Sequence, residues 1–244
     1  MTLRRHRYCL ENSLEAKKQG NMIQLTYVYH MAEAANWPAI QRDGLHSAST
    51  LLDIAGILGQ NRECLEKHQR LTHTVLPNGV QLRDQRPMPP EALVTCLIGI
   101  SPAEWYALIN THIFFWLDPA RLNRQRAACE PRPQVVLTVD AGRLLAAYGE
   151  RIALTPINTG NARRRPARRG TATFVPYAAW VLSAWTSEAA SLGTSVRSQS
   201  HPPVELTIPG SIPNIMQFVV DVQQLAPSQS FTPFPSDKLI IPQK

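Results

Sequence analysis

Proline is frequent in this chain and limits the length of many of the helices and strands that it can form. The sequence has 20 prolines in 244 residues and only 12 glycines. Because proline lacks a backbone N–H and fixes its own φ angle, helix interiors and central strands exclude it. The pattern predicts short strands, short helices and shaped loops, and it argues against an all-helical bundle.

The size and charge of the chain narrow the class of protein further. With 44% hydrophobic residues, a chain of this length can bury a full core, since roughly 70% of the unfolded surface is hidden at this size. The formal net charge is +7, with 20 arginines and 5 lysines, so phosphate-bearing or other acidic partners are expected.

Targeting and metal-binding signals are weak. No apolar run approaches the roughly 20 residues of a membrane helix, and the basic N-terminus is not followed by an apolar stretch, so cytoplasmic residence without a membrane partner is expected. The cysteines Cys9, Cys64, Cys96 and Cys129 are far apart. They predict no metal site, and we expect reduced and mostly buried thiols.

Helical signals dominate the first half of the chain. A strand is predicted over residues 23–30, ending at His30, and a helix over 32–43 that stops at Gly44. Further helices are predicted over 47–59, 61–71, 91–99 and 102–110, with Ser101 as the N-cap of the last. Between them, the proline-rich residues 83–90 must form a shaped loop.

Strand signals dominate the second half. Short β-rich segments cover residues 113–117, 134–139, 152–154, 171–175, 204–208 and 216–222. Residues 183–203 are expected to form a loop. Helices first and antiparallel-type strands later predict one α+β domain over residues 23–224, between an N-terminal extension (1–22) and a Pro/Ser-rich tail (225–244). Neither a Rossmann nor a P-loop glycine motif occurs.

Seven short motifs follow one another along the chain. They are residues 29–32 (Tyr-His-Met-Ala), 36–45 (Asn-Trp-Pro-Ala-Ile-Gln-Arg-Asp-Gly-Leu), 83–88 (Arg-Asp-Gln-Arg-Pro-Met), 114–116 (Phe-Phe-Trp), 156–160 (Pro-Ile-Asn-Thr-Gly), 169–174 (Arg-Gly-Thr-Ala-Thr-Phe) and 205–210 (Glu-Leu-Thr-Ile-Pro-Gly). Taken in this order, they resemble the DarT-like ADP-ribosyltransferases, which are DNA- or RNA-modifying toxins, and a related uncharacterised family. The resemblance covers about residues 25–222. It implies a split, twisted β-sheet with a helical N-terminal part, and NAD+ as substrate without a metal.

The resemblance assigns catalysis to Glu205, at the head of a predicted strand. When nicotinamide leaves the ribose of NAD+, positive charge develops on the sugar, and a carboxylate can stabilise it. Taken alone, Glu205 would be an ordinary exposed glutamate in a salt bridge. Position 203 is Pro203, where the enzymes that modify protein arginines have a second acidic or amide side chain, so this departure argues against an arginine acceptor.

Contacts to NAD+ are assigned, also by resemblance, around the first strand. His30 would bind the adenosine-side ribose, with Met31 and Ala32 beside it, whereas a lone histidine is more often a core or edge residue. Asn36 would add a polar contact, and it also suits the N-cap of the following helix.

Arginine is suited to bidentate binding of a pyrophosphate. Arg83 and Arg86, in the proline-fixed loop, are the preferred pair, and Arg83 is also assigned to the catalytic group. Arg62 and Arg70 remain open as alternatives for a further family arginine. Any single one of the 20 arginines is more often a solvated surface charge.

Two further groups are candidate contacts of NAD+. Trp116, with Phe115, could stack on nicotinamide, although such a strand is more often core. Asn158 belongs to a turn first and to a ligand loop second.

An arginine run suggests a second anionic substrate. Five arginines fall in seven residues: Arg163, Arg164, Arg165, Arg168 and Arg169. Such a cluster attracts phosphates and binds more weakly as salt rises, but without interleaved aromatics it predicts no reading of bases.

These features favour transfer of ADP-ribose to a nucleic-acid base by a toxin or phage-defence enzyme with a neutralising antitoxin partner. The alternatives are an NAD glycohydrolase, an RNA 2′-phosphotransferase-like enzyme, and a non-catalytic arginine-rich module that binds nucleic acid.

Overall fold

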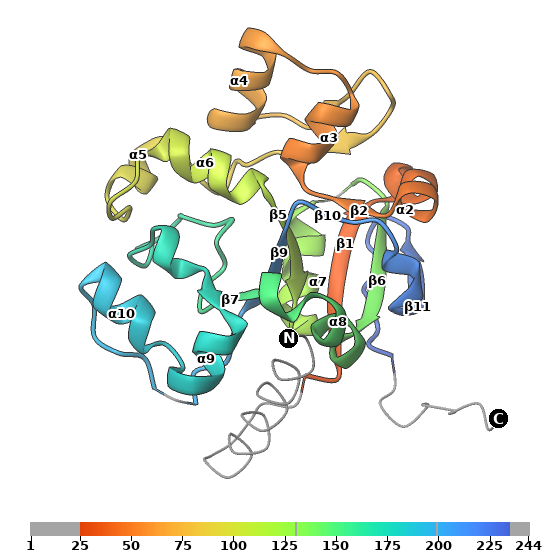
Figure 1. Cartoon of the computed structure of the whole chain (residues 1–244). Helices are drawn as coiled ribbons and strands as arrows, with labels where there is room; N and C mark the ends of the chain where they lie inside the picture. Colours follow the sequence, from red (N-terminus) through yellow and green to blue (C-terminus); the bar gives the residue numbers. More distant parts are fainter. Residues whose placement is uncertain (1–24, 130, 199, 235–244) are drawn as a thin grey trace, which may run out of the picture.

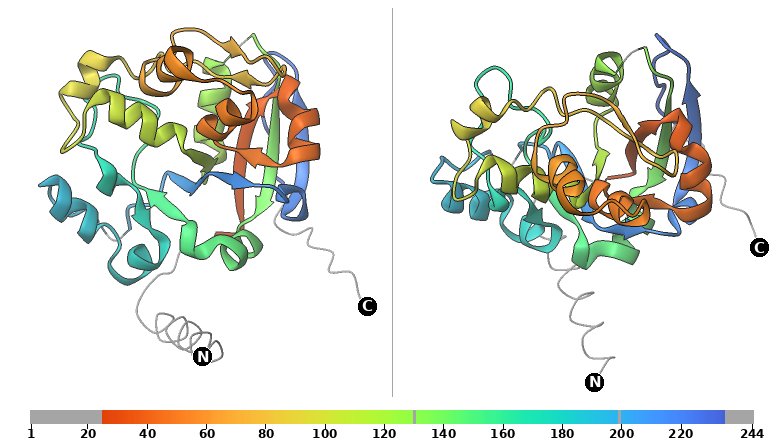
Figure 2. Two further views of the ribbon diagram at one scale, coloured as in Figure 1. Left: turned by 45° about the horizontal axis from the view of Figure 1, so that its top comes forward. Right: turned by 90° about the horizontal axis from the view of Figure 1, so that it is seen from above.

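The computed structural model of the chain describes residues 25–129, 131–198 and 200–234, and its centre is a seven-stranded antiparallel sheet (Figures 1 and 2). In spatial order the strands are β11 (Val219–Leu225), β6 (Gln134–Asp140), β1 (Tyr27–Glu33), β5 (His112–Trp116), β9 (Glu205–Pro209), β7 (Ala153–Thr155) and β8 (Val175–Pro176). The prediction of a mixed fold of helices and antiparallel strands is confirmed.

Short helices surround the sheet, and the longest in the described ranges, α7, has 10 residues, as the proline content predicts. The helices are α2 (Trp37–Asp43), α3 (Ala48–Ile54), α4 (Gly59–Lys67), α5 (Pro90–Val94), α6 (Pro102–Asn110), α7 (Pro119–Ala128), α8 (Ala141–Tyr148), α9 (Tyr177–Ser183) and α10 (Thr186–Leu192). Single 3-10 turns are η1 (Ala34–Asn36), η2 (Gly149–Arg151), η3 (Thr171–Thr173) and η4 (Ile215–Gln217). Two small ribbons pair β2 (Leu45–His46) with β10 (Ser211–Ile212), and β3 (Thr74–Val75) with β4 (Gln81–Leu82).

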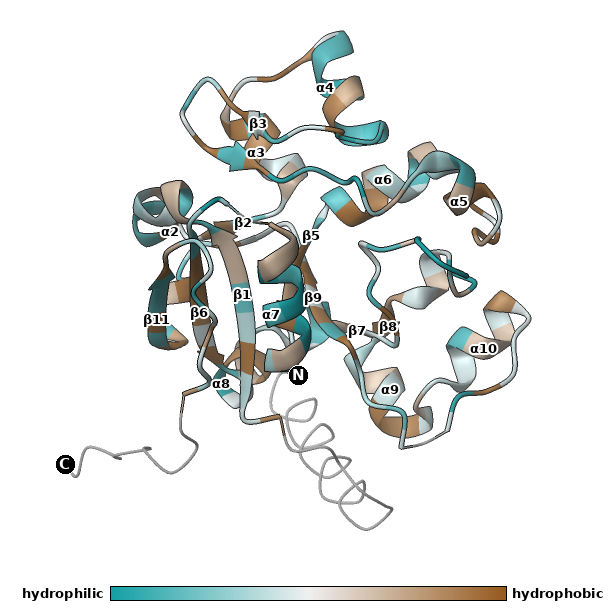
Figure 3. Cartoon of the chain, turned by 180° about the vertical axis from the view of Figure 1, so that it is seen from behind, coloured by the Kyte–Doolittle hydropathy of each residue, from teal (hydrophilic) through white to brown (hydrophobic). Residues whose placement is uncertain are grey.

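The central strands are buried on both faces, and Figure 3 shows hydrophobic residues concentrated on them. Successive side chains of a strand point to opposite faces. In β1, Val28 packs into the core beneath α8, whereas Tyr29 and Met31 pack into the core that includes Leu122 of α7. The sheet therefore separates two cores, and α7 covers the face opposite α8.

The sheet is split between β1 and β5. β1 pairs with β6 through seven residues, but with β5 only through Tyr29 and Trp116. Beyond this pair the two strands separate, and the Nδ1 atom of His30 bridges the gap to the carbonyl oxygen of Phe114 at 2.9 Å. The backbone between β1 and β5 is therefore open at the position of the cavity described below.

The predicted elements of the first half are present with shifted bounds. The predicted strand over 23–30 is β1, which continues to Glu33, so His30 lies inside a strand and not at its end. The reason is that β6 pairs with β1 through Glu33. Gly44 ends α2 with a φ of 88°, and a side chain there would collide with the carbonyl oxygen of Ile212. The N-cap of α6 at Ser101 forms the predicted capping box.

The second half contains helices that strand patterns alone did not predict. α7 and α8 begin after Asp118 and Asp140, whose side chains accept backbone N–H groups of the first turn. The predicted loop over 183–203 contains α10. The predicted strand over 171–175 is wrong for residues 171–173, because the N–H of Thr173 donates to the carbonyl oxygen of Gly170 and closes a 3-10 turn. The N–H of Gly170 donates in return to Oγ1 of Thr173.

Several predictions fall at the edges of the described ranges. The extension 1–22 and Cys9 lie outside them, as do residues 235–244 of the predicted tail. The described start of that tail is packed on the sheet, where the buried ring of Phe231 contacts Tyr29. Cys96 and Cys129 are buried as expected, but Cys64 is exposed on the charged surface of α4. No helix in the described ranges is long and apolar enough to cross a membrane.

Candidate functional site

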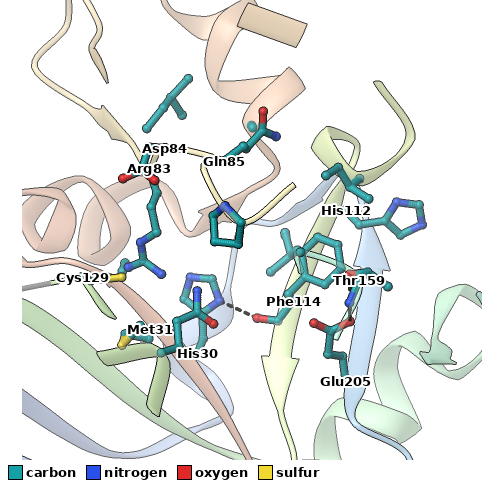
Figure 4. Close-up of a pocket in the computed structure, with 18 of the residues that line it drawn as sticks. His30, Met31, Arg83, Asp84, Gln85, His112, Phe114, Cys129, Thr159 and Glu205 are labelled. Atoms are coloured by element: carbon teal, nitrogen blue, oxygen red, sulfur yellow. Dashed lines mark hydrogen bonds between the residues drawn. The ribbon is translucent and has the colours of Figure 1, made fainter. Parts of the chain in front are cut away.

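A cavity of about 630 Å³ lies where β1 and β5 separate (Figure 4). Its walls include residues 30–33 of β1, residues 81–85, residues 112–116 of β5, the turn 158–161, Glu205 of β9 and one face of α7, with further contributions from α3, α6, Asn36 and Arg70. The volume falls within the roughly 300–1,000 Å³ of small-molecule sites. A split antiparallel sheet thus brings distant polar side chains around one space.

Glu205 begins β9 and lies between Trp116 of β5 and Thr155 of β7. Its side chain is only 4% exposed and lines the cavity. The Oε2 atom accepts hydrogen bonds from Oγ1 of Thr155 at 2.9 Å, from Oγ1 of Thr159 at 2.9 Å and from the backbone N–H of Thr159 at 3.2 Å. Oε1 bonds to no described residue, so the fold holds this carboxylate by one oxygen and leaves the other for a ligand.

Burial raises the pKa of Glu205 to about 7, because the folded chain withdraws the carboxylate from water. The hydrogen bonds from Thr159 and Thr155, and the positive charge of Arg169, lower the pKa without cancelling this effect. A carboxyl group that titrates near neutral pH inside a cavity is typical of functional sites.

His30 faces the same cavity as a neutral ring. The carbonyl oxygen of Phe114 can only accept, so Nδ1 carries the proton of their bond and Nε2 is left as an acceptor. Burial lowers the pKa of His30 to about 4; the bond to Phe114 opposes this shift and the charge of Arg83 adds to it. At neutral pH the imidazole can therefore accept a hydrogen bond from a hydroxyl group of a ligand.

An ion-paired cluster forms the cavity wall beside His30. Glu33 is only 3% exposed, and its carboxylate lies 3.2 Å from Nε of Arg83 and 3.1 Å from Nε of Arg132. Gln134 donates to Glu33 at 2.7 Å and accepts from Nη2 of Arg83 at 2.7 Å. Asp84 lies 3.8 Å from Arg132. Asp84 also lies 4.0 Å from Nε of Arg86. Glu33 and Gln134 therefore fix Arg83 in position.

Arg70, which with Arg62 is one of the two candidates for the further family arginine, is buried and holds the loop that carries Arg83. Its Nε donates to the carbonyl oxygen of Arg83 at 3.1 Å, and its Nη1 donates to Oδ1 of Asn110 at 3.1 Å. Burial lowers the pKa of Arg70 to about 10, so it remains charged at neutral pH. Arg70 lines the cavity, whereas Arg62 pairs with Asp53 and Glu66 on the surface.

The structure places most of the predicted NAD+ contacts around the cavity. The wall includes Met31, Ala32, Asn36, Trp116 and Asn158. Asn36 precedes α2 but its side chain does not cap the helix. Instead, its amide bonds the backbone of Gln81 in both directions, at 2.9 and 2.8 Å, and so fixes the loop before Arg83.

Arg83 and Arg86, the pair predicted to bind the pyrophosphate, do not lie in the same site. Arg83 lines the cavity, but Arg86 does not. The side chain of Arg86 is 62% exposed, and its Nε donates to the carbonyl oxygen of Leu71 at 2.7 Å.

The arginine run also divides. Arg163, Arg164, Arg165 and Arg168 are exposed, but Arg169, predicted as part of the same phosphate-attracting cluster, is buried. Arg169 is 2% exposed, and its Nη1 donates to the carbonyl oxygens of Asn161 at 2.9 Å and Thr159 at 3.3 Å. This arginine holds the turn that presents Thr159 to Glu205.

Thr155 and Glu33 hold site residues in place, although the sequence offered no functional signal for them. Thr159 was marked only as a member of the motif at 156–160. Thr159 lies in a predicted turn, and Glu33 follows the expected end of a strand. Their partners are distant in sequence: Thr159 and Glu205 are 46 residues apart, and Glu33 and Gln134 are 101 residues apart. Within the ranges that the structure describes, no cluster of His, Cys, Asp or Glu could hold a metal ion.

Comparison with known proteins relates the chain to a family and to a solved structure. A family model described as a family of unknown function (DUF7002) matches residues 26–219. A solved structure of DarT from Thermus sp. 2.9 in complex with NAD+ superposes with a TM-score of 0.36 and 10% sequence identity, covering 83% of each chain. A search of curated proteins gave no match.

Proposed function

The chain belongs to the DUF7002 family, a family of unknown function, and we propose that it is an NAD+-dependent ADP-ribosyltransferase. In this proposal ADP-ribose passes from NAD+ to a nucleic-acid base, and nicotinamide is released. The observation that carries the proposal is Glu205, a buried carboxylate held through one oxygen at the wall of a cavity of about 630 Å³. The resemblance to the DarT-like enzymes extends the proposal to a toxin or defence role with a neutralising partner.

The chemistry requires a fixed negative charge beside the ribose. The bond between C1′ and the nicotinamide nitrogen breaks, and its electron pair stays with the nitrogen. The acceptor atom forms the new bond to C1′ and gives up its proton, for which Glu205 is the base. Because Thr155 and Thr159 already orient the carboxylate, little reorganisation is needed when positive charge develops on the sugar.

The remaining wall suits a dinucleotide. Nε2 of His30 can accept a hydrogen bond from a ribose hydroxyl. Arg83 is oriented by Glu33 and Gln134, so its guanidinium is preorganised at the wall beside His30. Trp116 and Asn158 supply an aromatic surface and an amide. These groups support the assignment of NAD+ as the substrate that occupies the cavity.

An exposed arginine loop supports nucleic acid as the acceptor. Arg163, Arg164 and Arg165 follow directly on the turn that lines the cavity, and all three are exposed. Nη2 of Arg163 reaches the carbonyl oxygen of Arg86 at 3.3 Å, so the loop lies beside a further exposed arginine. Such a positive surface attracts a phosphate backbone.

Incubation with labelled NAD+ and, in separate reactions, DNA, RNA or protein tests the function. Label on nucleic acid that disappears in Glu205→Gln supports the proposal. Glu150→Gln, which changes an exposed glutamate in η2, is the matched control and should retain activity. Free ADP-ribose without labelled acceptor would indicate a glycohydrolase, and no reaction together with salt-sensitive nucleic-acid binding would indicate a non-catalytic module.

The acceptor surface has its own test. Replacing Arg163, Arg164 and Arg165 with alanine should weaken binding of the acceptor and flatten its salt dependence while NAD+ binding is unchanged. Arg143→Ala, at an exposed position of α8 outside the cavity, is the control. Equal loss of NAD+ binding in the triple variant would contradict this assignment.

A further inference from the structure

One face of α7 presents arginines to the cavity. Arg121, Arg124, Gln125 and Ala128 all line it. Their spacing of three, four and seven residues puts them on one side of a helix. Leu122 points the other way and is fully buried in the core that α7 shares with β1. The apolar contact fixes the rotation of the helix, and that rotation directs the arginines toward the cavity.

α7 runs along the cavity from the carboxylate to the ion-paired cluster. The helix starts shortly after Trp116, which pairs with Glu205. It ends at Cys129, whose thiol lies within the electrostatic influence of Arg83 and Glu33. At about 1.5 Å per residue, the two ends of α7 are on the order of 15 Å apart. Arg121 and Arg124 therefore lie between the two ends of the cavity.

Neither of these two arginines pairs with a buried carboxylate among the described residues. Arg83, in contrast, is ion-paired with the buried carboxylate of Glu33. Arg124 is exposed at the mouth of the cavity and bonds to no residue in the part of the chain that the structure describes. Arg121 lies 3.7 Å from Asp118, and both side chains are partly exposed. Among the arginines that line the cavity, Arg83 is held by Glu33 and Gln134 and Arg70 by carbonyl and amide oxygens. Arg121 and Arg124 on α7 therefore have donors left for a ligand.

We propose that Arg121 and Arg124 bind the diphosphate of the dinucleotide substrate. This assignment rests on the proposed function and replaces the predicted pair of Arg83 and Arg86 in that role. A diphosphate bridge carries about two negative charges, and arginine donates to phosphate oxygens bidentately. Two arginines one helical turn apart supply both the charge and the donors.

Calorimetric binding of two probes tests the assignment. ADP-ribose contains the diphosphate, and adenosine contains the same nucleoside without phosphate. The double variant Arg121→Gln, Arg124→Gln should bind ADP-ribose at least tenfold more weakly and adenosine unchanged. Arg143→Gln, an exposed helical arginine outside the cavity, should behave as wild type, and Arg121→Lys, Arg124→Lys should retain part of the affinity because the charge remains.

Two results would overturn the assignment: wild-type affinity for ADP-ribose in the double glutamine variant, or equal loss of ADP-ribose and adenosine binding. Absence of ADP-ribose binding by the wild-type protein would also overturn it. If only the proposed function is wrong, the result is distinguishable. The protein would then bind ADP-ribose through α7 and yet release no nicotinamide from NAD+. That result would support the diphosphate site and reject the transferase.

Discussion

Replacing Glu205 with glutamine should make the folded protein more stable at alkaline pH. The carboxylate is buried, and only one of its two oxygens is hydrogen-bonded to described residues. Glutamine has nearly the same shape, and its carbonyl oxygen can accept the bonds from Thr155 and Thr159. The variant keeps these contacts and removes the cost of burying a charge.

The expected magnitude follows from the pKa of Glu205, which burial raises from 4.5 to about 7. Below pH 4.5 the carboxyl group is protonated in both the folded and the unfolded chain, so its ionisation does not lower the free energy of unfolding. Between pH 4.5 and 7 only the unfolded chain ionises, so the free energy of unfolding of the wild type falls by about 1.4 kcal/mol per pH unit. Above pH 7 the loss is complete and amounts to about 3 kcal/mol.

Urea unfolding of both proteins at several pH values between 4 and 8 measures this difference. Tryptophan fluorescence is a suitable signal, since Trp105 and Trp185 are fully buried. The free energy of unfolding of Glu205→Gln minus that of the wild type should increase by about 3 kcal/mol from pH 4 to pH 8. Other titrating groups contribute equally to both proteins and cancel.

The control is Glu150→Gln, at an exposed position, which should change the free energy of unfolding by no more than about 0.5 kcal/mol across the series. Parallel curves for Glu205→Gln and the wild type would refute the reasoning. They would mean that the fold does not penalise the ionised carboxylate and that its chemistry at neutral pH needs another account.

Three further predictions concern the same site. The value of kcat/KM for NAD+ should rise about tenfold per pH unit below pH 7 and level off above it, because Glu205 must be ionised and its pKa is about 7. His30, with a pKa of about 4, does not titrate in this range. A flat pH profile would contradict the role of the carboxylate. Thr159→Ala should move this acid limb to higher pH, since it removes a hydrogen bond that lowers the pKa of Glu205; an unchanged midpoint in the same assay would speak against that contact. Arg83→Gln should lower the free energy of unfolding by about 2 kcal/mol, because the buried Glu33 loses one of its two ion pairs. Denaturant titration measures this change. A loss below about 0.5 kcal/mol would show that the ion pair contributes little to stability.

Several local features could be predicted from the sequence because neighbouring residues determine them. Ser101 and Glu104 make the capping box of α6 within four residues. Gly44 ends α2 because the chain there needs a positive φ. β-branched, aromatic and other apolar residues mark β1 and β6, since both sides of these strands face a core. The caps at Asp118 and Asp140 were equally local signals, but the strand pattern around them concealed the short helices that they begin.

The sequence by itself determined that this chain forms a mixed fold of short helices and antiparallel strands, and it placed Glu205 at the head of a strand. Only the tertiary structure decided what each charged side chain does. It opened the sheet between β1 and β5, balanced Arg83 against Glu33, buried Arg169 behind Thr159 and left Arg124 facing the cavity. The physical reason is that helix caps and strand patterns act over a few residues, whereas the role of an arginine depends on which distant group lies opposite it.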